Sequence, residues 1–173
     1  MLLEEREYYK PFVYPWAFEF YKKQQQMHWL PDEVPLQDDI RDYKEKLSEG
    51  ERTLIDNIFK FFTQADVDVC CGYAKHYLPT FKQPEIRMML VSYAAMEAVH
   101  QEAYSLLLET LGKSDDQYQE FMDIQEMVEK HEYLTDFNMT TPHEIAKTMA
   151  VYSGFTEGVQ LFSSFAILLN YPR

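Results

Sequence analysis

Apolar residues recur three and four positions apart over three long stretches of the chain, a spacing typical of one face of an α-helix. In the first stretch, Ile58 and Phe62 follow this spacing. Ser48 and Glu51 precede them with the three-residue separation of a capping box, which marks the start of a helix. We therefore expect a long helix over residues 48–78.

Proline and glycine mark the limits of the other two long helices. Pro79 predicts the end of the first helix, and Pro84 suits the first turn of the second. Gly112 suits its end, because glycine readily adopts the left-handed conformation that closes many helices. Pro142 opens the third long helix, which we expect to reach residue 170. The short connection between the first two helices predicts that they are antiparallel neighbours.

Shorter helices are expected over residues 15–28, 38–47 and 114–133. The chain has only 5 Gly in 173 residues and no Asn-Gly hairpin signal, so strands are not expected. Its length predicts one all-α domain over the whole chain. Within it, residues 1–47 form an amino-terminal segment with short helices, and residues 48–173 form the long helices that carry the candidate ligands.

The composition narrows the classes of function. The chain has 16 Lys and Arg against 29 Asp and Glu, and its net charge of -13 repels a phosphate backbone, so no nucleic-acid partner is expected. Cys70 and Cys71 are adjacent and poorly placed for a disulfide, which predicts free thiols in a reducing, cytoplasmic compartment. The first residues are acidic, unlike an export signal. The longest uncharged run, residues 158–172, is shorter than the roughly 20 residues of a membrane span.

Two acidic residues occupy matching places in the first two long helices. Asp66 lies 13 residues before Pro79, and Glu97 lies 13 residues after Pro84. At 1.5 Å per residue both lie roughly 20 Å from the turn, so antiparallel packing places them at the same height. His100 follows Glu97 by three residues and therefore shares its helix face.

A third acid, Glu157, lies in the middle of the third long helix, where Leu161 and Phe165 continue its face. Burying three carboxylates together is costly unless cations compensate them, so metal ions are the simplest explanation. Dimetal carboxylate bundles take one acid from each of two helices and Glu-x-x-His from each of the other two. This chain supplies two single acids and one Glu-x-x-His. A lone Glu-x-x-His also arises by chance as a solvated or core-satisfied pair, which remains the alternative.

Several segments spread along nearly the whole chain match the motifs of one family. Residues 28–33 read His-Trp-Leu-Pro-Asp-Glu, residues 96–104 read Met-Glu-Ala-Val-His-Gln-Glu-Ala-Tyr, and residues 156–158 read Thr-Glu-Gly. Together with Asp66 and Phe165, they resemble the small, radical-generating subunit of class I ribonucleotide reductase. The resemblance implies a ferritin-like helical bundle that serves ribonucleoside-diphosphate reductase, which makes the deoxyribonucleotides needed for DNA replication.

The resemblance also implies roles for individual side chains. The metal ligands would be Asp66, Glu97, His100 and Glu157. Glu97 would bridge the two ions of a dinuclear iron centre, with manganese or a mixed centre as the alternative. Tyr104 would be oxidised to a stable tyrosyl radical, and it lies one turn after His100 on the same face. Trp29 would take part in electron transfer, with plain packing as the alternative.

The chain departs from the family's pattern, because it lacks a second Glu-x-x-His, a fourth ligand helix and the carboxy-terminal tail that docks to the large subunit. We therefore expect the amino-terminal half of a split subunit, an incomplete bundle with three of its four ligand helices, inactive alone. A companion chain would complete it, with two copies of each half serving the large catalytic subunit. An expressed fragment of a longer protein is the alternative. The rival functions are a ferritin-like iron-oxidising or storage homo-oligomer and a non-catalytic assembly fragment.

Three further expectations concern side chains outside the ligand set. Cys70 is expected to be a small core residue. Asp68 is expected to point away from Asp66 and to be solvated. The missing wall of the bundle is expected to expose an apolar stripe that includes Leu161, Phe165 and Leu169.

Overall fold

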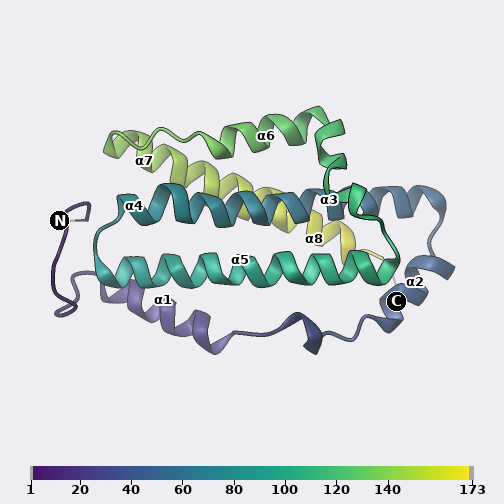
Figure 1. Cartoon of the computed structure of the whole chain (residues 1–173), viewed down its shortest axis with the longest axis horizontal. Coiled ribbons are helices and arrows are strands. Elements are labelled where there is room, and N and C mark those ends of the chain that lie inside the picture. The colour runs from purple at the N-terminus through teal and green to yellow at the C-terminus, as the bar shows by residue number, and fades with distance from the viewer. Residues whose placement is uncertain (1, 172–173) are drawn as a thin grey trace.

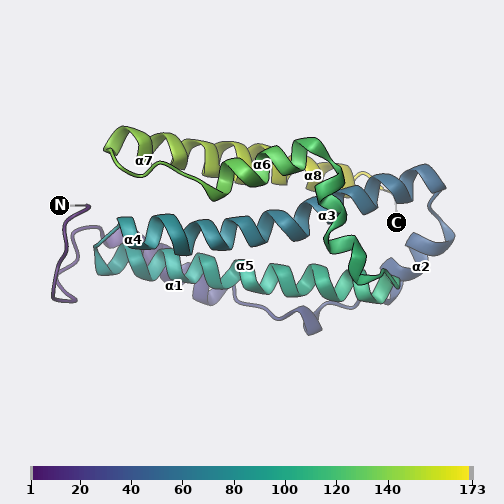
Figure 2. The ribbon, with the colours of Figure 1, turned by 45° about the horizontal axis from the view of Figure 1, so that its top comes forward.

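Two long antiparallel helices form the centre of the structure. The computed structural model describes residues 2–171, and every regular element among them is helical. The first long helix, α3, spans Glu49–Gly72 and continues through a π turn, Tyr73–Tyr77, into the short α4, Leu78–Thr80. The second, α5, spans Pro84–Leu111. They lie side by side in Figures 1 and 2, which confirms the predicted hairpin.

The amino-terminal helices flank α5. Helix α1, Pro15–Gln26, packs along α5, and the chain then passes through a 3-10 turn, Pro31–Glu33. Helix α2, Gln37–Glu45, follows at the opposite end of the bundle (Figure 1). Both α-helices lie within two residues of the ranges that the sequence predicts.

The third long helix is not a regular α-helix throughout. It begins as α7, Pro142–Met149, continues as a π segment, Ala150–Leu161, and ends as α8, Phe162–Leu168. The π hydrogen-bonding pattern widens the turn, so the spacing of three and four residues does not describe the faces of this segment. Among residues 2–171 no helix combines the length and the hydropathy that a membrane span requires.

The predicted helix caps are present. Ser48 accepts a hydrogen bond from the backbone N–H of Glu51, and the Glu51 carboxylate accepts one from the backbone N–H of Ser48 at 2.7 Å. Gly112 closes α5 in the left-handed conformation with φ of 79°. Thr141 accepts a hydrogen bond from the backbone N–H of Glu144 at 3.2 Å. These contacts satisfy backbone groups that a helix end would otherwise leave unpaired.

Two predicted helix limits are wrong. Pro79 does not end the first long helix, which continues to Thr80, because the preceding π turn changes the backbone spacing that a proline ring would otherwise obstruct. The helix predicted over residues 114–133 begins only at Gln125, where α6, Gln125–Thr135, starts to pack on α3. The residues after Ser114 form two 3-10 turns instead, since its aspartate neighbours are weak helix formers.

The buried apolar side chains form two separate clusters. The cluster near the α3–α5 turn includes Val69, Tyr77, Ile86, Leu90 and Tyr152. The cluster at the other end includes Ile55, Ile58, Phe62, Leu108 and Leu111. Asp66 on α3 and Glu97 on α5 lie in the chain between the residues of the two clusters. The two apolar clusters therefore hold the helices together on either side of the acidic residues.

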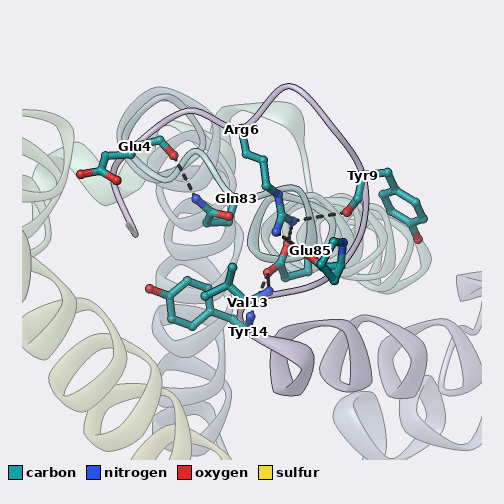
Figure 3. A network of polar contacts seen from close by, with 8 residues as sticks. Glu4, Arg6, Tyr9, Val13, Tyr14, Gln83 and Glu85 are labelled. Carbon is teal, nitrogen blue, oxygen red and sulfur yellow. Dashed lines mark hydrogen bonds and ion pairs between the residues drawn. The ribbon is translucent and has the colours of Figure 1, made fainter.

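A buried ion pair fastens the amino-terminal segment to the start of α5 (Figure 3). Glu85 is fully buried, and its carboxylate accepts hydrogen bonds from Arg6 at 2.5 Å and from the backbone N–H groups of Val13 at 2.8 Å and Tyr14 at 2.9 Å. Burial alone would raise the pKa of Glu85, but these donors outweigh it and hold the pKa below its usual range. The charge is therefore compensated, as a buried carboxylate requires.

Tyr152 joins the third long helix to α3. Its hydroxyl donates a hydrogen bond to the backbone carbonyl of Val69, and its ring lies against Gly72. A Cβ atom at Gly72 would lie 2.5 Å from the Tyr152 hydroxyl oxygen, closer than any real contact. Glycine at this position therefore allows the two helices to approach.

We predict that Gly72→Ala destabilises the protein, because the added methyl group overlaps Tyr152 and overpacking a well-filled site costs roughly 1–3 kcal/mol. Gly50→Ala is the matched control, since it lies on the same helix and a methyl group there would meet no heavy atom within 4 Å. It should instead stabilise the protein by about 0.5–1 kcal/mol through helix propensity. Denaturant unfolding measures both, and equal stability of the two variants would contradict the predicted overlap.

Candidate metal centre

Asp66, Glu97 and His100 meet in the middle of the α3–α5 hairpin. Each offers one ligand atom, and these atoms all lie within 4.8 Å of one another. His100 Nδ1 lies 3.1 Å from Glu97 Oε2 and 4.0 Å from Asp66 Oδ2. The equal distances of the two acids from the turn therefore bring them to one height, as the sequence predicts. Their role as metal ligands stays a prediction.

Asp66 is the most confined of the three side chains. It is 5% exposed, and its Oδ2 atom is buried without a hydrogen-bond partner among the described residues. Burial, followed by the negative charge of Glu97, raises the pKa of Asp66 to about 7. An orphaned carboxylate oxygen is unfavourable in a protein interior. A cation bound here would remove that penalty.

Glu157 approaches this cluster from the third long helix but does not belong to the close group of three. It lies in the π segment, and its charge acts on both Asp66 and His100. Burial, followed by the charge of Glu97, raises the pKa of Glu157 to about 7. The structure thus brings the four predicted side chains into one electrostatic group, with Glu157 farther out than the other three.

The donor chemistry of the cluster fits a metal ion of intermediate hardness. Carboxylate oxygens and an imidazole nitrogen suit iron and manganese, and two of the acids could each supply a second oxygen. His100 Nδ1 faces the acids, and its hydrogen bond to Glu97 raises the pKa of His100 despite burial. The neighbouring acids thus favour the protonated, positively charged form of His100 in the metal-free protein.

Tyr104 lies next to this cluster in an aromatic environment. Its ring stacks on Phe62 with centroids 5.0 Å apart, and Phe62 also packs against Phe165 at 5.2 Å. Burial, followed by the charges of Asp66 and then Glu97, raises the pKa of the Tyr104 phenol. The phenol therefore stays protonated beside the acids.

Trp29 lies beside the imidazole of His100. Its ring centroid is 6.2 Å from that of His100, with the ring planes tilted by 33°. The connection between α1 and α2 thus places the Trp29 ring beside His100, a predicted metal ligand. This contact is compatible with both roles that the sequence leaves open, packing and electron transfer.

The expectation that Asp68 is solvated is wrong. Asp68 is 4% exposed, accepts a hydrogen bond from Gln64 at 2.7 Å, and lies 2.7 Å from Nδ1 of His131. It is buried because α6 covers this face of α3, a contact that the periodicity of α3 alone does not reveal. Cys70, expected in the core, is half-buried, and its thiol donates to the backbone carbonyl of Ala94 at 3.5 Å.

Sequence reasoning also missed Lys130, whose charge acts on Asp66 and Glu157 from α6. The sequence contains only a weak signal for this role of Lys130. Lys130 and His131 are adjacent basic residues in a helix whose Glu126 and Glu129 are exposed. Nothing in the sequence states which face of this helix packs against α3.

The chain is similar to ribonucleotide reductase small chains in sequence. The sequence profile of the family "Ribonucleotide reductase, small chain" matches residues 6–173. A "Probable ribonucleoside-diphosphate reductase small subunit" of Invertebrate iridescent virus 6 is 47% identical, over 99% of this chain and 51% of the viral protein. A protein of the same description from Invertebrate iridescent virus 3 is 43% identical, over 99% and 50%. The chain therefore spans about half the length of the curated relatives it matches.

The fold is also similar to that of a solved structure. The "Ribonucleotide reductase R2 subunit from Clostridium botulinum" superimposes with a TM-score of 0.79 at 22% sequence identity. The match covers 90% of this chain and 51% of the bacterial one. The similarity confirms the predicted all-α, ferritin-like fold class.

We predict that the metal-free protein loses stability as the pH rises from about 4 to about 7. The folded state keeps a proton on Asp66 up to a pKa of about 7, whereas the unfolded chain releases it near the usual value of 3.8. The unfolded state thus binds fewer protons in this window, and Asp66 alone removes about 1.4 kcal/mol of stability per pH unit. Urea unfolding in the presence of a chelator, repeated across this pH range, measures the slope.

The Asp66→Asn variant should have a flatter pH profile and a higher stability at pH 8 than the unsubstituted protein. Glu126→Gln is the matched control, because it removes one exposed carboxylate and should leave the slope unchanged. If stability depends on pH equally steeply in Asp66→Asn and in the unsubstituted protein, burial of the Asp66 carboxylate does not disfavour its charged form.

Proposed function

The chain belongs to the ribonucleotide reductase small-chain family, and on that premise we propose that it forms part of the small subunit of a ribonucleoside-diphosphate reductase. In this proposal it supplies four of the six ligands of a dinuclear metal centre and the tyrosine that the centre oxidises. The observation that carries the proposal is the close group of Asp66, Glu97 and His100 with one buried, unpartnered carboxylate oxygen.

Four side chains would hold the metal ions, namely Asp66, Glu97, His100 and Glu157. The family resemblance gives Glu97 the bridging role, and Glu97 is the acid whose charge acts most strongly on both Asp66 and Glu157. A dinuclear iron centre is proposed, with manganese or a mixed centre as the alternative. The bound metal ions supply one-electron oxidation with oxygen as the oxidant.

Tyr104 would supply the electron and lose its phenol proton to become a neutral radical. Asp66 is the acid whose charge acts most strongly on this phenol, so we propose it as the acceptor of the phenol proton. Phe62 stacks on the Tyr104 ring, Phe165 packs against Phe62, and this aromatic packing would limit the access of water. An apolar wall of this kind would extend the lifetime of a phenoxyl radical.

Trp29 would lie on the route by which electrons reach or leave the centre, since it packs against the imidazole of His100. The oxidising equivalent would then pass to a separate large subunit, where ribonucleotides are reduced. We propose the cytoplasm as the location, where a reducing environment keeps Cys70 and Cys71 as free thiols.

The donor set supports a further part of the proposal, that residues outside this sequence complete the centre. Dimetal carboxylate bundles use six ligands, and the four that this chain offers lack the second Glu-x-x-His. Large apolar side chains on the π segment, on α8 and directly after α8 are exposed, with exposed fractions of 63% for Phe155, 57% for Val159, 68% for Phe162 and 81% for Leu169. We propose a companion chain that covers them, two copies of each half in the assembly, and no activity of this chain alone.

We predict that metal binding depends on the close group of three. Asp66→Asn, Glu97→Gln and His100→Ala should each weaken Mn²⁺ binding at least about tenfold, because each removes a direct donor. Isothermal titration of the chelator-treated protein measures the affinity, and Glu126→Gln serves as the control that changes charge without touching the centre. Unaltered affinity in all three variants would refute the centre.

The number of bound ions separates the proposal from its rivals. At most one weakly held ion is expected for the chain alone, and two for the chain completed by a segment with Glu-x-x-His. Two tightly held ions in each copy of an oligomer of this chain alone would instead support iron oxidation or storage. Absence of metal from the completed assembly would support a non-catalytic assembly role.

We predict that Tyr104→Phe abolishes the radical. The completed, iron-loaded assembly is exposed to oxygen, and electron paramagnetic resonance detects the tyrosyl signal. Tyr93→Phe is the matched control, because Tyr93 lies one turn before Glu97 on the same helix and packs against Tyr73 with centroids 6.1 Å apart. Loss of the signal is expected only in the Tyr104 variant. An unchanged signal there would place the radical elsewhere.

A further inference from the structure

Lys130 places an ammonium group in the interior next to the acidic cluster. The residue lies on α6, and its Nζ atom is shielded from solvent without a hydrogen-bond partner among the described residues. The ammonium instead lies over an aromatic face, with Nζ 4.1 Å from the ring centroid of Phe61. A small cavity lined by Gln64, Ala65 and Asp68 adjoins it. A buried ammonium with no acceptor needs compensation from charges farther away.

The charges that compensate Lys130 are the acids of α3 and the third long helix. Asp68, Glu157 and Asp66 all act on Lys130 in the direction that favours its charged form. Burial acts in the opposite direction and is the larger effect, so the pKa of Lys130 falls to about 8. Conversely, Lys130 favours the charged forms of Asp66 and Glu157. The interaction therefore connects α6 with two predicted ligands.

Lys130 differs in this respect from the other lysine at the same side of α3. Lys60 forms an ion pair with Glu120 at 2.7 Å, so its charge is compensated locally. Asp68 is the acid that acts most strongly on Lys130 and lines the same small cavity, but its carboxylate already pairs with His131 at 2.7 Å. The charge of Lys130 also acts on Glu157 and Asp66 in the cluster. We propose that Lys130 is the resident cation of the acidic cluster, which stabilises the cluster in the metal-free protein and opposes the entry of metal ions.

The physical basis is competition between cations for the same carboxylates. Without metal, the positive charge of Lys130 offsets part of the repulsion among the acids. When a divalent ion binds, the same charge repels it, and the repulsion is weakly screened because Nζ is shielded from water. Lys130 would thereby lower the affinity of the centre for metal ions below the value that its ligands alone would give. It would do so through its charge, without coordinating the metal.

This inference rests on the proposed metal centre, but its first test needs no metal. Lys130→Met and Asp66→Asn are combined in a double-mutant cycle, with urea unfolding of the chelator-treated protein at pH 7.5. Lys130→Met should lower the folding equilibrium constant. The factor by which it does so should be about threefold larger in the unsubstituted protein than in the Asp66→Asn background. Equal effects in both backgrounds would overturn the proposed coupling.

The second test is the titration of Mn²⁺ into the folded variants. Lys130→Met should bind Mn²⁺ more tightly, on the order of tenfold, because the repelling charge is gone. Lys130→Arg should behave like the unsubstituted protein, since it keeps the charge, and Lys60→Met is the control for loss of a lysine outside the cluster. If Lys130→Met fails to fold, Lys130→Gln replaces it in both tests.

The outcomes separate this inference from the metal centre itself. Tighter binding in Lys130→Met with rescue by Lys130→Arg supports it, because a purely structural role of the lysine would weaken binding or leave it unchanged. Unchanged or weaker binding in a folded Lys130→Met overturns it, even if Asp66→Asn abolishes binding. If the unsubstituted protein does not bind Mn²⁺, the metal centre fails and so does the proposed opposition to metal entry, while the double-mutant cycle still decides the coupling.

Discussion

The burial of several carboxylates at one height of a helical bundle is the constraint on which the rest of the structure depends. Asp66 is almost fully buried, and Glu97 and Glu157 add negative charge to the same small volume. Among the described residues, two basic side chains act on these acids: His100, whose protonated form they favour, and Lys130 on α6. This compensation is incomplete, since one oxygen of Asp66 has no partner. This uncompensated carboxylate oxygen is the observation behind the proposed metal centre.

The remaining interactions maintain this unfavourable cluster. Two apolar clusters lie on either side of it and hold α3 and α5 together. At the end near the turn, Tyr152 binds the backbone of α3 at the one place where Gly72 leaves room for its ring. This contact attaches the π segment that carries Glu157. The favourable free energy of apolar packing thus offsets the local electrostatic penalty, as is common where side chains are arranged for function.

Much of the arrangement follows from local sequence signals. The capping box at Ser48, the glycine at residue 112 and the prolines at 84 and 142 determine where the long helices begin and end, because they act through backbone groups only a few residues away. The short connection then makes α3 and α5 antiparallel. Their equal lengths from the turn bring Asp66 and Glu97 to one height, so the centre of the site could be predicted by counting residues.

Only the tertiary structure decided which groups surround that centre. The side of α3 that α6 covers determines that Asp68 is buried and that Lys130 acts on the cluster, and no periodicity within either helix encodes this contact. The π segment likewise changes the direction in which Glu157 projects, because its hydrogen bonds depart from the regular spacing assumed for an α-helix. The starts of the long helices and the end of α5 depend on nearby backbone groups, so the sequence determined them, whereas the continuation past Pro79 and the start of α6 did not follow from these signals. Charge compensation depends on side chains far apart in the sequence, so the packing of the helices determined it.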